Sequence, residues 1–153
     1  DARVLIVGAG GAARGIAQPL LQTGPACMVI ANRTVSRARE LAALIGAPGE
    51  VYPCALDEIS DPFDLVINAT AASLSGEVPA LPEGVFHSGT TAYDLAYADQ
   101  PTAFMRWALG LGAARAVNGL GMLVEQAAES FWIWHHQRPQ TGSVISALRS
   151  GVR

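Results

Sequence analysis

The hydrophobic pattern of the chain begins with a short apolar run at residues 4–7, which ends at Gly8. A run of this length, rich in β-branched residues, is typical of a strand that is buried on both faces of a sheet. Residues 11–22 then carry apolar side chains at helical spacing, up to a glycine and a proline that close the segment. The pattern predicts a strand followed directly by a helix, and Pro19 is expected to bend that helix.

The same alternation of apolar runs and helically spaced segments continues to about residue 136. Further strands are predicted at 28–31, 51–55, 64–68, 92–95 and 115–117, and further helices at 36–45, 102–111 and 119–136. Because Pro53 cannot donate a backbone hydrogen bond, the third strand is expected to be short or to lie at an edge. The alternation predicts an α/β fold of Rossmann type: a doubly wound parallel sheet of about six strands with helices on both faces.

The domain organisation follows from length and composition. A chain of 153 residues suits one domain, and the half of its residues that are apolar can supply the core. We expect residues 1–138 to form the sheet domain. Residues 139–153 carry Val144, Ile145 and Leu148 at short helical spacing, which predicts a C-terminal helix. That helix either packs on its own sheet or presents an apolar stripe to another part of the protein.

Charge and residue spacing exclude several classes of partner. The formal net charge is −3, and no basic run suggests a nucleic-acid surface. No apolar run reaches the ~18 residues that span a bilayer, so we expect a cytoplasmic protein with no membrane partner. Neither a disulfide framework nor a metal site is expected. The spacing typical of disulfide-linked or metal-binding residues is absent among Cys27, Cys54, His87, His135 and His136.

A glycine-rich run connects the first strand to the first helix. It comprises Gly8, Ala9, Gly10, Gly11 and Ala12, and is followed by Ala13. In a dinucleotide-binding fold the first glycine allows a tight turn, the second lets the backbone approach a pyrophosphate, and a small residue at position 13 lets the helix lie close to the strand. The helix N-terminus offers N–H groups to the phosphates. This context favours a nucleotide site over a glycine-rich turn without a ligand.

The residues that end the second strand predict which dinucleotide binds. An NAD site usually places Asp or Glu there, to accept hydrogen bonds from the adenosine ribose. This chain instead has Asn32, Arg33 and Thr34, followed by Arg37. Guanidinium groups are forked, permanently charged donors that suit a 2′-phosphate, so the sequence predicts NADP. The alternative is that both arginines are solvated residues at the start of a helix.

Together with further motifs, these residues resemble the shikimate dehydrogenase family. The motifs are Gly-Ala-Gly-Gly-Ala at 8–12, Asn-Arg-Thr at 32–34 with Arg37, Asn-Ala-Thr at 68–70, Tyr-Asp-Leu-Ala-Tyr at 93–97, and Asn-Gly-Leu-Gly-Met-Leu at 118–123 leading to Gln126. They are collinear from residue 3 to about residue 138, so the combination is far more specific than any one motif. The stretch Ala-Ala-Ser at 71–73, Leu95 and Asn118 depart from residues that are common in the family.

The resemblance implies an enzyme that reduces 3-dehydroshikimate to shikimate by hydride transfer from NADPH. The adenosine 2′-phosphate would be held by Asn32, Arg33, Thr34 and Arg37, with residues 8–12 at the pyrophosphate. The other implied cofactor contacts are Asn68, Ala69, Thr70, Leu95, Gly119 and Met122. Tyr97 and Gln126 match the two substrate contacts that this half of such an enzyme supplies.

The spacing in the long helix supports part of this assignment independently. Gly119, Met122 and Gln126 are three and four positions apart and so share one stripe of the helix. A neighbouring apolar stripe is expected to pack on the sheet; it comprises Leu120, Leu123, Ala127, Phe131 and Trp134. The spacing is also compatible with roles other than ligand contact: Met122 as an ordinary core residue and Gln126 as a solvated residue of the helix. Tyr97 is likewise compatible with a packing role.

The chain contains no lysine, and all of its basic residues other than histidine are arginines. The resemblance implies a catalytic Lys and Asp in a substrate-binding half. Arginine stays protonated near neutral pH and is no credible proton donor. Since the sequence opens at Asp1 without an initiator Met, we expect an N-terminal substrate domain to precede it, with the 139–153 helix packing toward that domain.

Three other functions remain open from the sequence. Two are enzymes with a similar cofactor half, a quinate/shikimate dehydrogenase and a glutamyl-tRNA reductase; Tyr97 and Gln126 favour shikimate dehydrogenase. The third is a non-catalytic module that senses NADP, which fits the absence of lysine.

Overall fold

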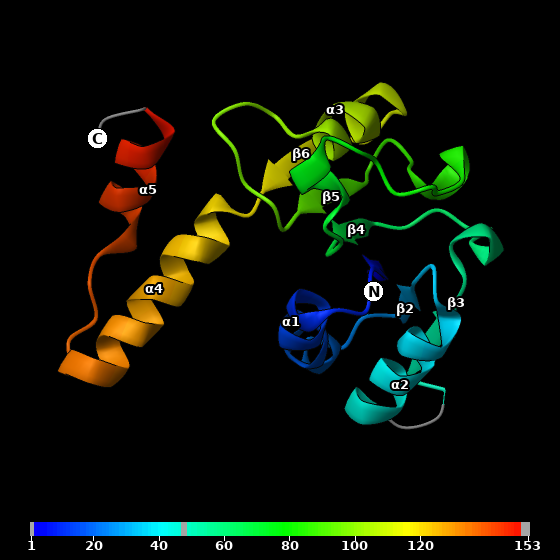
Figure 1. Ribbon diagram of the computed structural model, residues 1–153, viewed down its shortest axis with the longest axis horizontal. Coiled ribbons are helices and arrows are strands. Elements are labelled where there is room, and N and C mark those ends of the chain that lie inside the picture. Colours follow the sequence, from blue (N-terminus) through cyan, green and yellow to red (C-terminus); the bar gives the residue numbers. More distant parts are fainter. Residues whose placement is uncertain (1, 47–48, 151–153) are drawn as a thin grey trace.

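The computed structural model describes residues 2–46 and 49–150, and a six-stranded parallel sheet forms its centre (Figure 1). The strands are β1 (Arg3–Val7), β2 (Cys27–Ala31), β3 (Val51–Cys54), β4 (Leu65–Asn68), β5 (Thr91–Asp94) and β6 (Arg115–Asn118). Their order in space is β3-β2-β1-β4-β5-β6, and every neighbouring pair is parallel. The predicted Rossmann-type sheet is confirmed, and β3 with its Pro53 lies at an edge.

Helices cover both faces of the sheet, as predicted. On one face, α1 (Gly11–Gln22) and α2 (Val35–Ile45) pack on β1 and β2, and the small side chains of Ala13 and Ala17 are fully buried there. On the other face, α3 (Ala103–Gly110) buries Phe104 beneath Trp107 and Phe86. Three short 3₁₀ turns complete the connections: η1 (Leu56–Glu58), η2 (Ala72–Ser75) and η3 (Glu83–Val85).

The predicted ends of the strands, and of the four helices expected within residues 1–138, agree with the structure to within one residue. The strands agree because apolar runs bounded by Gly, Pro and Asn leave little freedom in where a buried strand stops. The helix α1 continues from Gly11 to Gln22 with Pro19 inside it. The three 3₁₀ turns were not predicted, since single turns have no periodicity to detect.

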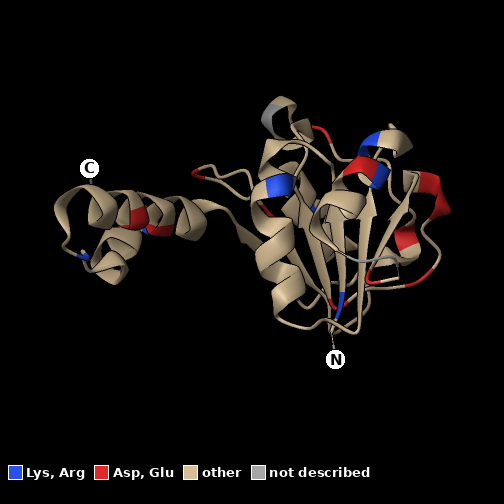
Figure 2. Ribbon diagram, turned by 90° about the horizontal axis from the view of Figure 1, so that it is seen from below, with Lys and Arg blue, Asp and Glu red and all other residues tan. Residues whose placement is uncertain are grey.

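The long helix α4 (Leu120–His135) leaves the body of the sheet instead of lying on it (Figures 1 and 2). The prediction that its apolar stripe packs on the sheet is therefore wrong: Phe131 is 42% exposed and Trp134 is 74% exposed. Apolar residues occupy several sides of α4, so the spacing alone does not determine which side is covered. The helix that α4 contacts is α5 (Thr141–Arg149), which folds back beside it.

The two helices form a hairpin that projects from the sheet (Figure 2). His136 ends α4 in a left-handed conformation with φ of 53°, and an ion pair between Arg138 and Glu129 ties the connection to α4. The C-terminal helix is thus present as predicted, and it packs on α4 and not on the sheet. Within the described part of the chain, no helix has the length and apolar character needed to cross a membrane.

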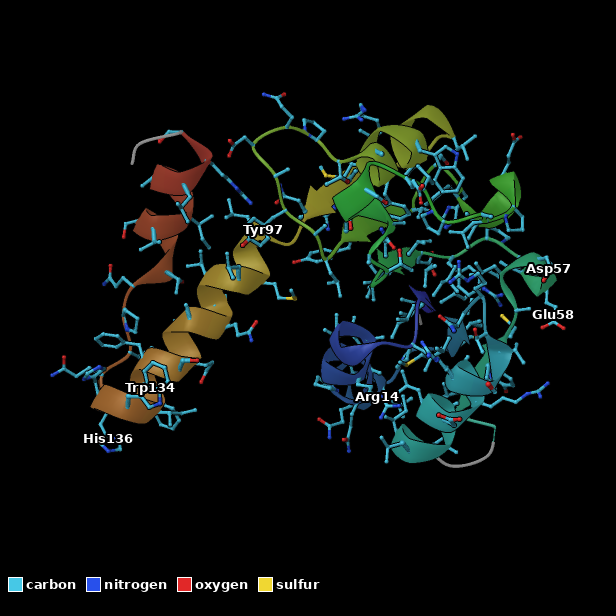
Figure 3. The ribbon with its side chains drawn as sticks, in the orientation of Figure 1. Arg14, Asp57, Glu58, Tyr97, Trp134 and His136 are labelled. Carbon is cyan, nitrogen blue, oxygen red and sulfur yellow. The ribbon has the colours of Figure 1, made fainter. Side chains whose placement is uncertain are left out.

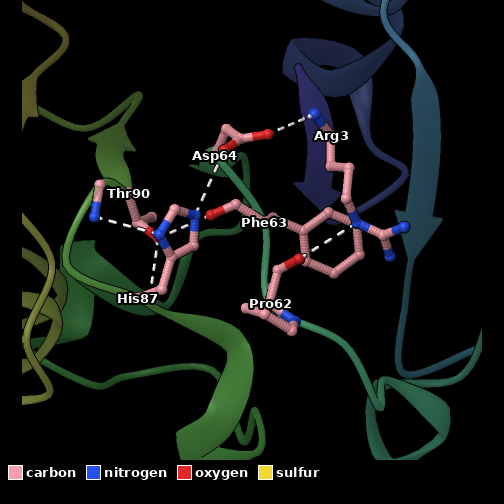
Figure 4. A network of polar contacts seen from close by, with 7 residues as sticks. Arg3, Pro62, Phe63, Asp64, His87 and Thr90 are labelled. Carbon is pink, nitrogen blue, oxygen red and sulfur yellow. Dashed lines mark hydrogen bonds and ion pairs between the residues drawn. The ribbon is translucent and has the colours of Figure 1, made fainter. Parts of the chain in front are cut away.

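A polar network fastens the amino-terminal end of the sheet (Figure 4). The Arg3 backbone N–H donates to the Asp64 carboxylate at 2.7 Å, and His87 Nε2 lies 3.3 Å from the same group. His87 Nδ1 accepts from the Gly89 N–H at 3.1 Å, so Nε2 is the nitrogen that faces Asp64 as a donor. The Arg3 hydrogen bond, with help from His87, lowers the pKa of Asp64 below its ordinary value.

This lowered pKa predicts how stability changes with acid. Because the pKa of Asp64 is lower in the folded state, ionised Asp64 stabilises the fold. This stabilisation is complete above the pKa that Asp64 has in the unfolded chain, and it is lost as the pH falls through the pKa of Asp64 in the folded state. Asp64→Asn should therefore be less stable than the parent at neutral pH, and the difference should shrink below about pH 4. Urea unfolding at stepped pH values measures it. Asp61→Asn, which removes only an exposed partner of Arg3, is the control.

Candidate dinucleotide-binding site

The carboxyl ends of β1 and β4 lie side by side where the order of the strands reverses. Val7 pairs with Asn68 in this register, so the two chains leave the sheet at the same level. The chain after β1 enters α1 on one face, while the segments after β4 pack with the opposite face. Such a divergence opens the crevice in which doubly wound sheets bind dinucleotides.

The turn after β1 requires glycine at its first position. Gly8 has φ of 110°, in the left-handed region, and its N–H donates to the Ala31 carbonyl at 2.8 Å. A Cβ at this position would lie 3.0 Å from the Ala69 carbonyl oxygen. The predicted tight turn is therefore confirmed, and it brings the backbone of residue 8 against the end of β4.

The next two glycines leave space where a phosphate could lie. A Cβ built on Gly10 or Gly11 would meet no atom within 4 Å. Gly10 precedes the first turn of α1, which has neither a capping side chain nor an acidic residue. The first N–H groups of α1 are thus available to an anion, and the fully buried Ala13 lets α1 lie close to the sheet. Open space and free N–H groups are what a pyrophosphate would require at this turn.

A cleft of about 470 Å³ joins this turn to the end of β2. Gly8, Thr70, Asn32 and Arg33 line it, together with Leu56 and residues 71, 72, 75 and 77–80. The structure thus brings Arg33 into the same cleft as the glycine turn. The lining by the 71–80 loop was not predicted, because its Pro and Gly content indicated only a connection.

The other two residues predicted for the 2′-phosphate lie at the start of α2. Thr34 is its N-cap residue and Arg37 belongs to its first turn, and both are exposed. The Asn32 side chain donates to the Thr34 carbonyl at 2.8 Å, which fixes the turn between β2 and α2. No acidic residue occupies the first turn of α2, so its positive dipole end adds to the two arginines.

A second cleft, of about 430 Å³, lies on the other side of Thr70. Its lining residues are Ala12, Ala69, Thr70, Leu95, Ala96 and Tyr97. Five of these six were predicted to contact cofactor or substrate, although they come from three separate segments of the sequence. Tyr97 is 53% exposed on the loop after β5 (Figure 3), so the packing role that the sequence left open is at most partial.

The predicted residues of α4 are distributed differently. Gly119 is buried, with its N–H bonded to the Ala96 carbonyl at 3.0 Å, and Met122 shares a third, apolar cleft with Leu95 and Tyr93. Burial raises the pKa of the Tyr93 hydroxyl, and a hydrogen bond with the Met122 backbone opposes that rise. Gln126 is exposed one turn farther along α4. The structure therefore brings Gly119 and Met122 to the site region but leaves Gln126 open to solvent.

A buried polar network behind the second cleft was missed by the sequence analysis. Asp94, at the end of β5, is fully buried and accepts hydrogen bonds from Asn68, Ser73 and Thr102. Asn68 in turn accepts from the Thr70 N–H and hydroxyl, at 3.1 and 2.7 Å. An aspartate that ends a buried strand, with Ser and Thr nearby in the chain, was the available signal.

Comparison with known proteins agrees with this geometry. The family model described as shikimate/quinate 5-dehydrogenase matches residues 1–75, and the model of the shikimate 5′-dehydrogenase C-terminal domain matches residues 119–149. A curated relative from Alkalilimnicola ehrlichii, named shikimate dehydrogenase (NADP(+)), is 54% identical over 96% of this chain. The chain belongs to the shikimate dehydrogenase family.

Solved structures of similar proteins share the fold. An Ael1 enzyme from Pseudomonas putida is 42% identical, with a TM-score of 0.90 over 99% of this chain and 56% of its own. The Thermus thermophilus shikimate 5-dehydrogenase, solved with NADP(H) and shikimate, is 31% identical, with a TM-score of 0.78 over 98% of this chain and 55% of its own. The chain spans about half the length of the relatives that it matches; for the A. ehrlichii protein the share is 54%.

The contact between α4 and the loop after β5 yields a steric prediction. A Cβ on Gly119 would lie 2.1 Å from the Leu95 carbonyl oxygen, so Gly119→Ala must displace backbone and should lower the free energy of unfolding by about 1–3 kcal/mol. Gly121→Ala is the matched control. Gly121 lies within α4, and a Cβ built on it would meet no atom within 4 Å, so this change should raise the free energy of unfolding by up to about 1 kcal/mol. Urea unfolding of both variants checks this, and equal effects would contradict the contact.

Proposed function

We propose that this chain is the NADP-binding half of a shikimate dehydrogenase, which reduces 3-dehydroshikimate to shikimate with NADPH. The observation that carries the proposal is the cleft in which Arg33 and Asn32 face the same space as Gly8 and Thr70. The family membership supports the substrate, and the names of the relatives supply the NADP. The cytoplasmic location expected from the sequence is part of this proposal.

The choice of NADP over NAD rests on charge. The end of β2 carries no carboxylate to accept bonds from a free ribose hydroxyl, and Arg33 and Arg37 flank the place where a 2′-phosphate would lie. At about 4 Å and an effective dielectric near 20, each guanidinium–phosphate pair contributes up to ~4 kcal/mol before desolvation is subtracted. A carboxylate in this place would repel the phosphate instead.

The second cleft is the proposed place of the reaction. When bound, NADPH supplies the hydride. Thr70 and Leu95 line this cleft, and Leu95 also lines the third cleft together with Met122. We assign these three residues to orient the nicotinamide end of the cofactor. Tyr97 and Gln126 are assigned to the substrate, because the phenol and the amide are exposed and can donate hydrogen bonds to its hydroxyl groups.

The proton that completes the reduction is assigned to the half of such an enzyme that these 153 residues do not match. None of the ten arginines is a credible proton donor at neutral pH, and the chain has no lysine. The projecting α4–α5 hairpin supports an apolar contact with such a half; its exposed large apolar residues are Leu123, Phe131, Trp132, Ile133, Trp134, Val144 and Leu148. We assign the segment of residues 139–153 to that contact; its described part contains α5, and residues 151–153 lie outside the described residues.

The cofactor assignment predicts a selective loss on changing Arg33. Arg33→Ala removes a charge-assisted hydrogen bond to the 2′-phosphate and should weaken NADPH binding by on the order of 1–3 kcal/mol. NADH has no 2′-phosphate, so its weaker affinity should hardly change. Calorimetric titration of both cofactors into both proteins measures the two effects.

The control is Arg39→Ala, which removes the same charge two residues beyond Arg37, on a different side of α2. It should leave the affinities for both cofactors within about twofold of the parent, because exposed charges at a distance are screened. Equal losses of NADPH and NADH affinity in Arg33→Ala would place the 2′-phosphate elsewhere.

This assignment of the proton donor predicts that binding and catalysis separate. The chain alone should bind NADPH but not oxidise it with 3-dehydroshikimate, because a positioned general acid typically contributes ~10²–10⁴-fold and substrate orientation contributes more. Joining residues 1–153 to the N-terminal half of the A. ehrlichii relative should restore turnover, measured by NADPH absorbance. Turnover by the chain alone would place the proton donor within it. Binding without turnover in the joined protein would favour an NADP-sensing module.

A further inference from the structure

Asp94 is a buried carboxylate that the proposed reaction does not use. Its side chain is fully buried, and no ion pair among the described residues includes it. A carboxylate without a cation is costly to bury unless its oxygens are hydrogen-bonded. The chain therefore retains an energetically demanding group at the end of β5, beside the second cleft.

Four donors satisfy the carboxylate in a regular pattern. Oδ1 accepts from Asn68 Nδ2 and from the Ala96 N–H, both at 3.2 Å. Oδ2 accepts from the Ser73 hydroxyl at 2.5 Å and from the Thr102 hydroxyl at 2.6 Å. Asn68 ends β4 and Ser73 follows it, whereas Ala96 and Thr102 belong to the segment after β5. Each oxygen thus accepts one hydrogen bond from each of two loops.

The pattern fastens each loop at both ends. Asn68 and Ser73 enclose the loop of residues 68–73, which carries Thr70. Ala96 and Thr102 enclose the loop of residues 96–102, which carries Tyr97, and Thr102 also caps α3 by accepting from the Met105 N–H at 3.2 Å. Thr70 and Tyr97 line the same cleft. One side chain therefore sets the separation between the two walls of that cleft.

We propose that Asp94 is a positioning residue that fixes Tyr97 relative to Thr70, and so holds the substrate contact in register with the nicotinamide contact. The roles of Tyr97 and Thr70 rest on the proposed function, whereas the link between the two loops rests on the hydrogen bonds alone. The carboxylate touches no ligand in this proposal, because it is buried behind the residues that line the cleft.

The chemistry of the four donors determines which variants are informative. Asp94→Ala leaves four donors without their acceptor and removes packing, so it tests folding more than position. Thr102→Val keeps the shape of the side chain but loses the bond that fastens one end of the Tyr97 loop. Thr102→Ser restores the hydroxyl. Ser73→Ala releases one end of the Thr70 loop instead.

The chain offers a matched control in Thr90→Val. Thr90 is fully buried, donates its hydroxyl hydrogen to the Phe63 carbonyl at 2.6 Å and accepts from the His87 N–H at 2.9 Å. Thr102 likewise donates one hydrogen bond and accepts one. Thr90 precedes β5, whereas Thr102 follows it, so the control removes an equivalent hydroxyl at the opposite end of the sheet.

The experiment follows Tyr97 directly, in the chain labelled with 3-fluorotyrosine. Fluorine NMR should show one signal for each of the three tyrosines, and Tyr97→Phe assigns the signal of interest. In Thr102→Val this signal should sharpen and move toward that of the free amino acid, because the loop gains motion. Thr102→Ser and Thr90→Val should leave it in place. An unchanged signal in a folded Thr102→Val, or the same change in Thr90→Val, would overturn the proposal.

The second measurement is NADPH affinity. Ser73→Ala removes the bond that Ser73 donates to Asp94 and the one that it accepts from Asn68 Nδ2 at 2.9 Å, and should raise the Kd about three- to tenfold. Thr102→Val and Thr90→Val should raise it less than about twofold. If Thr102→Val does not fold, Ser73→Ala decides the matter: an unchanged Kd would contradict the link to the Thr70 loop. Failure of the parent chain to bind NADPH would refute the proposed function instead, and the Tyr97 signal would still test the link.

Discussion

The architecture of the site depends on how closely the turn at Gly8 approaches the end of β4. Gly8 donates to Ala31, Ala69 donates to Val7, and a side chain at position 8 would press on the Ala69 carbonyl. These contacts bring three strand ends to one level with almost no side-chain volume between them. The crevice is therefore bounded by backbone on its floor, which suits a ligand whose phosphates need N–H donors.

The two ends of the sheet meet their polar requirements in different ways. At the amino-terminal end, Asp64 and His87 form a half-exposed pair in which the pKa of the Asp64 carboxyl is lowered, chiefly by the Arg3 backbone hydrogen bond. At the carboxyl end, Asp94 is fully buried and each oxygen has two partners. Interactions of the buried kind gain strength from the low local dielectric and also impose a unique geometry. Buried hydrogen bonds are thus concentrated around the two loops that carry Thr70 and Tyr97.

How much of this could be predicted depends on the range of the interaction involved. The strands and the Gly8 turn followed from local sequence, because buried apolar runs and a left-handed glycine leave few alternatives. The Asp94 network joins residues 68 to 102 through side chains, and no periodicity records such a pairing. The packing of α4 was predicted wrongly because apolar residues occupy several of its sides. Which of these sides becomes covered is decided by tertiary contacts, which the helix pattern does not record. For the same reason, the exposure of Trp134 could not be read from the helix pattern.

The course of α4 determines what this chain can do alone. Its first turn is held by the bond between Gly119 and Ala96, which keeps Met122 beside Leu95. Beyond that turn the helix leaves the sheet, so Gln126 is exposed, and the later part of α4 packs against α5. The glycine turn and the residues that line the Arg33 cleft lie outside α4. Under the proposed function, a substrate contact through Gln126 would need a second structure to cover this face. The proposal therefore assigns cofactor affinity to the sheet and turnover to the sheet together with that second structure.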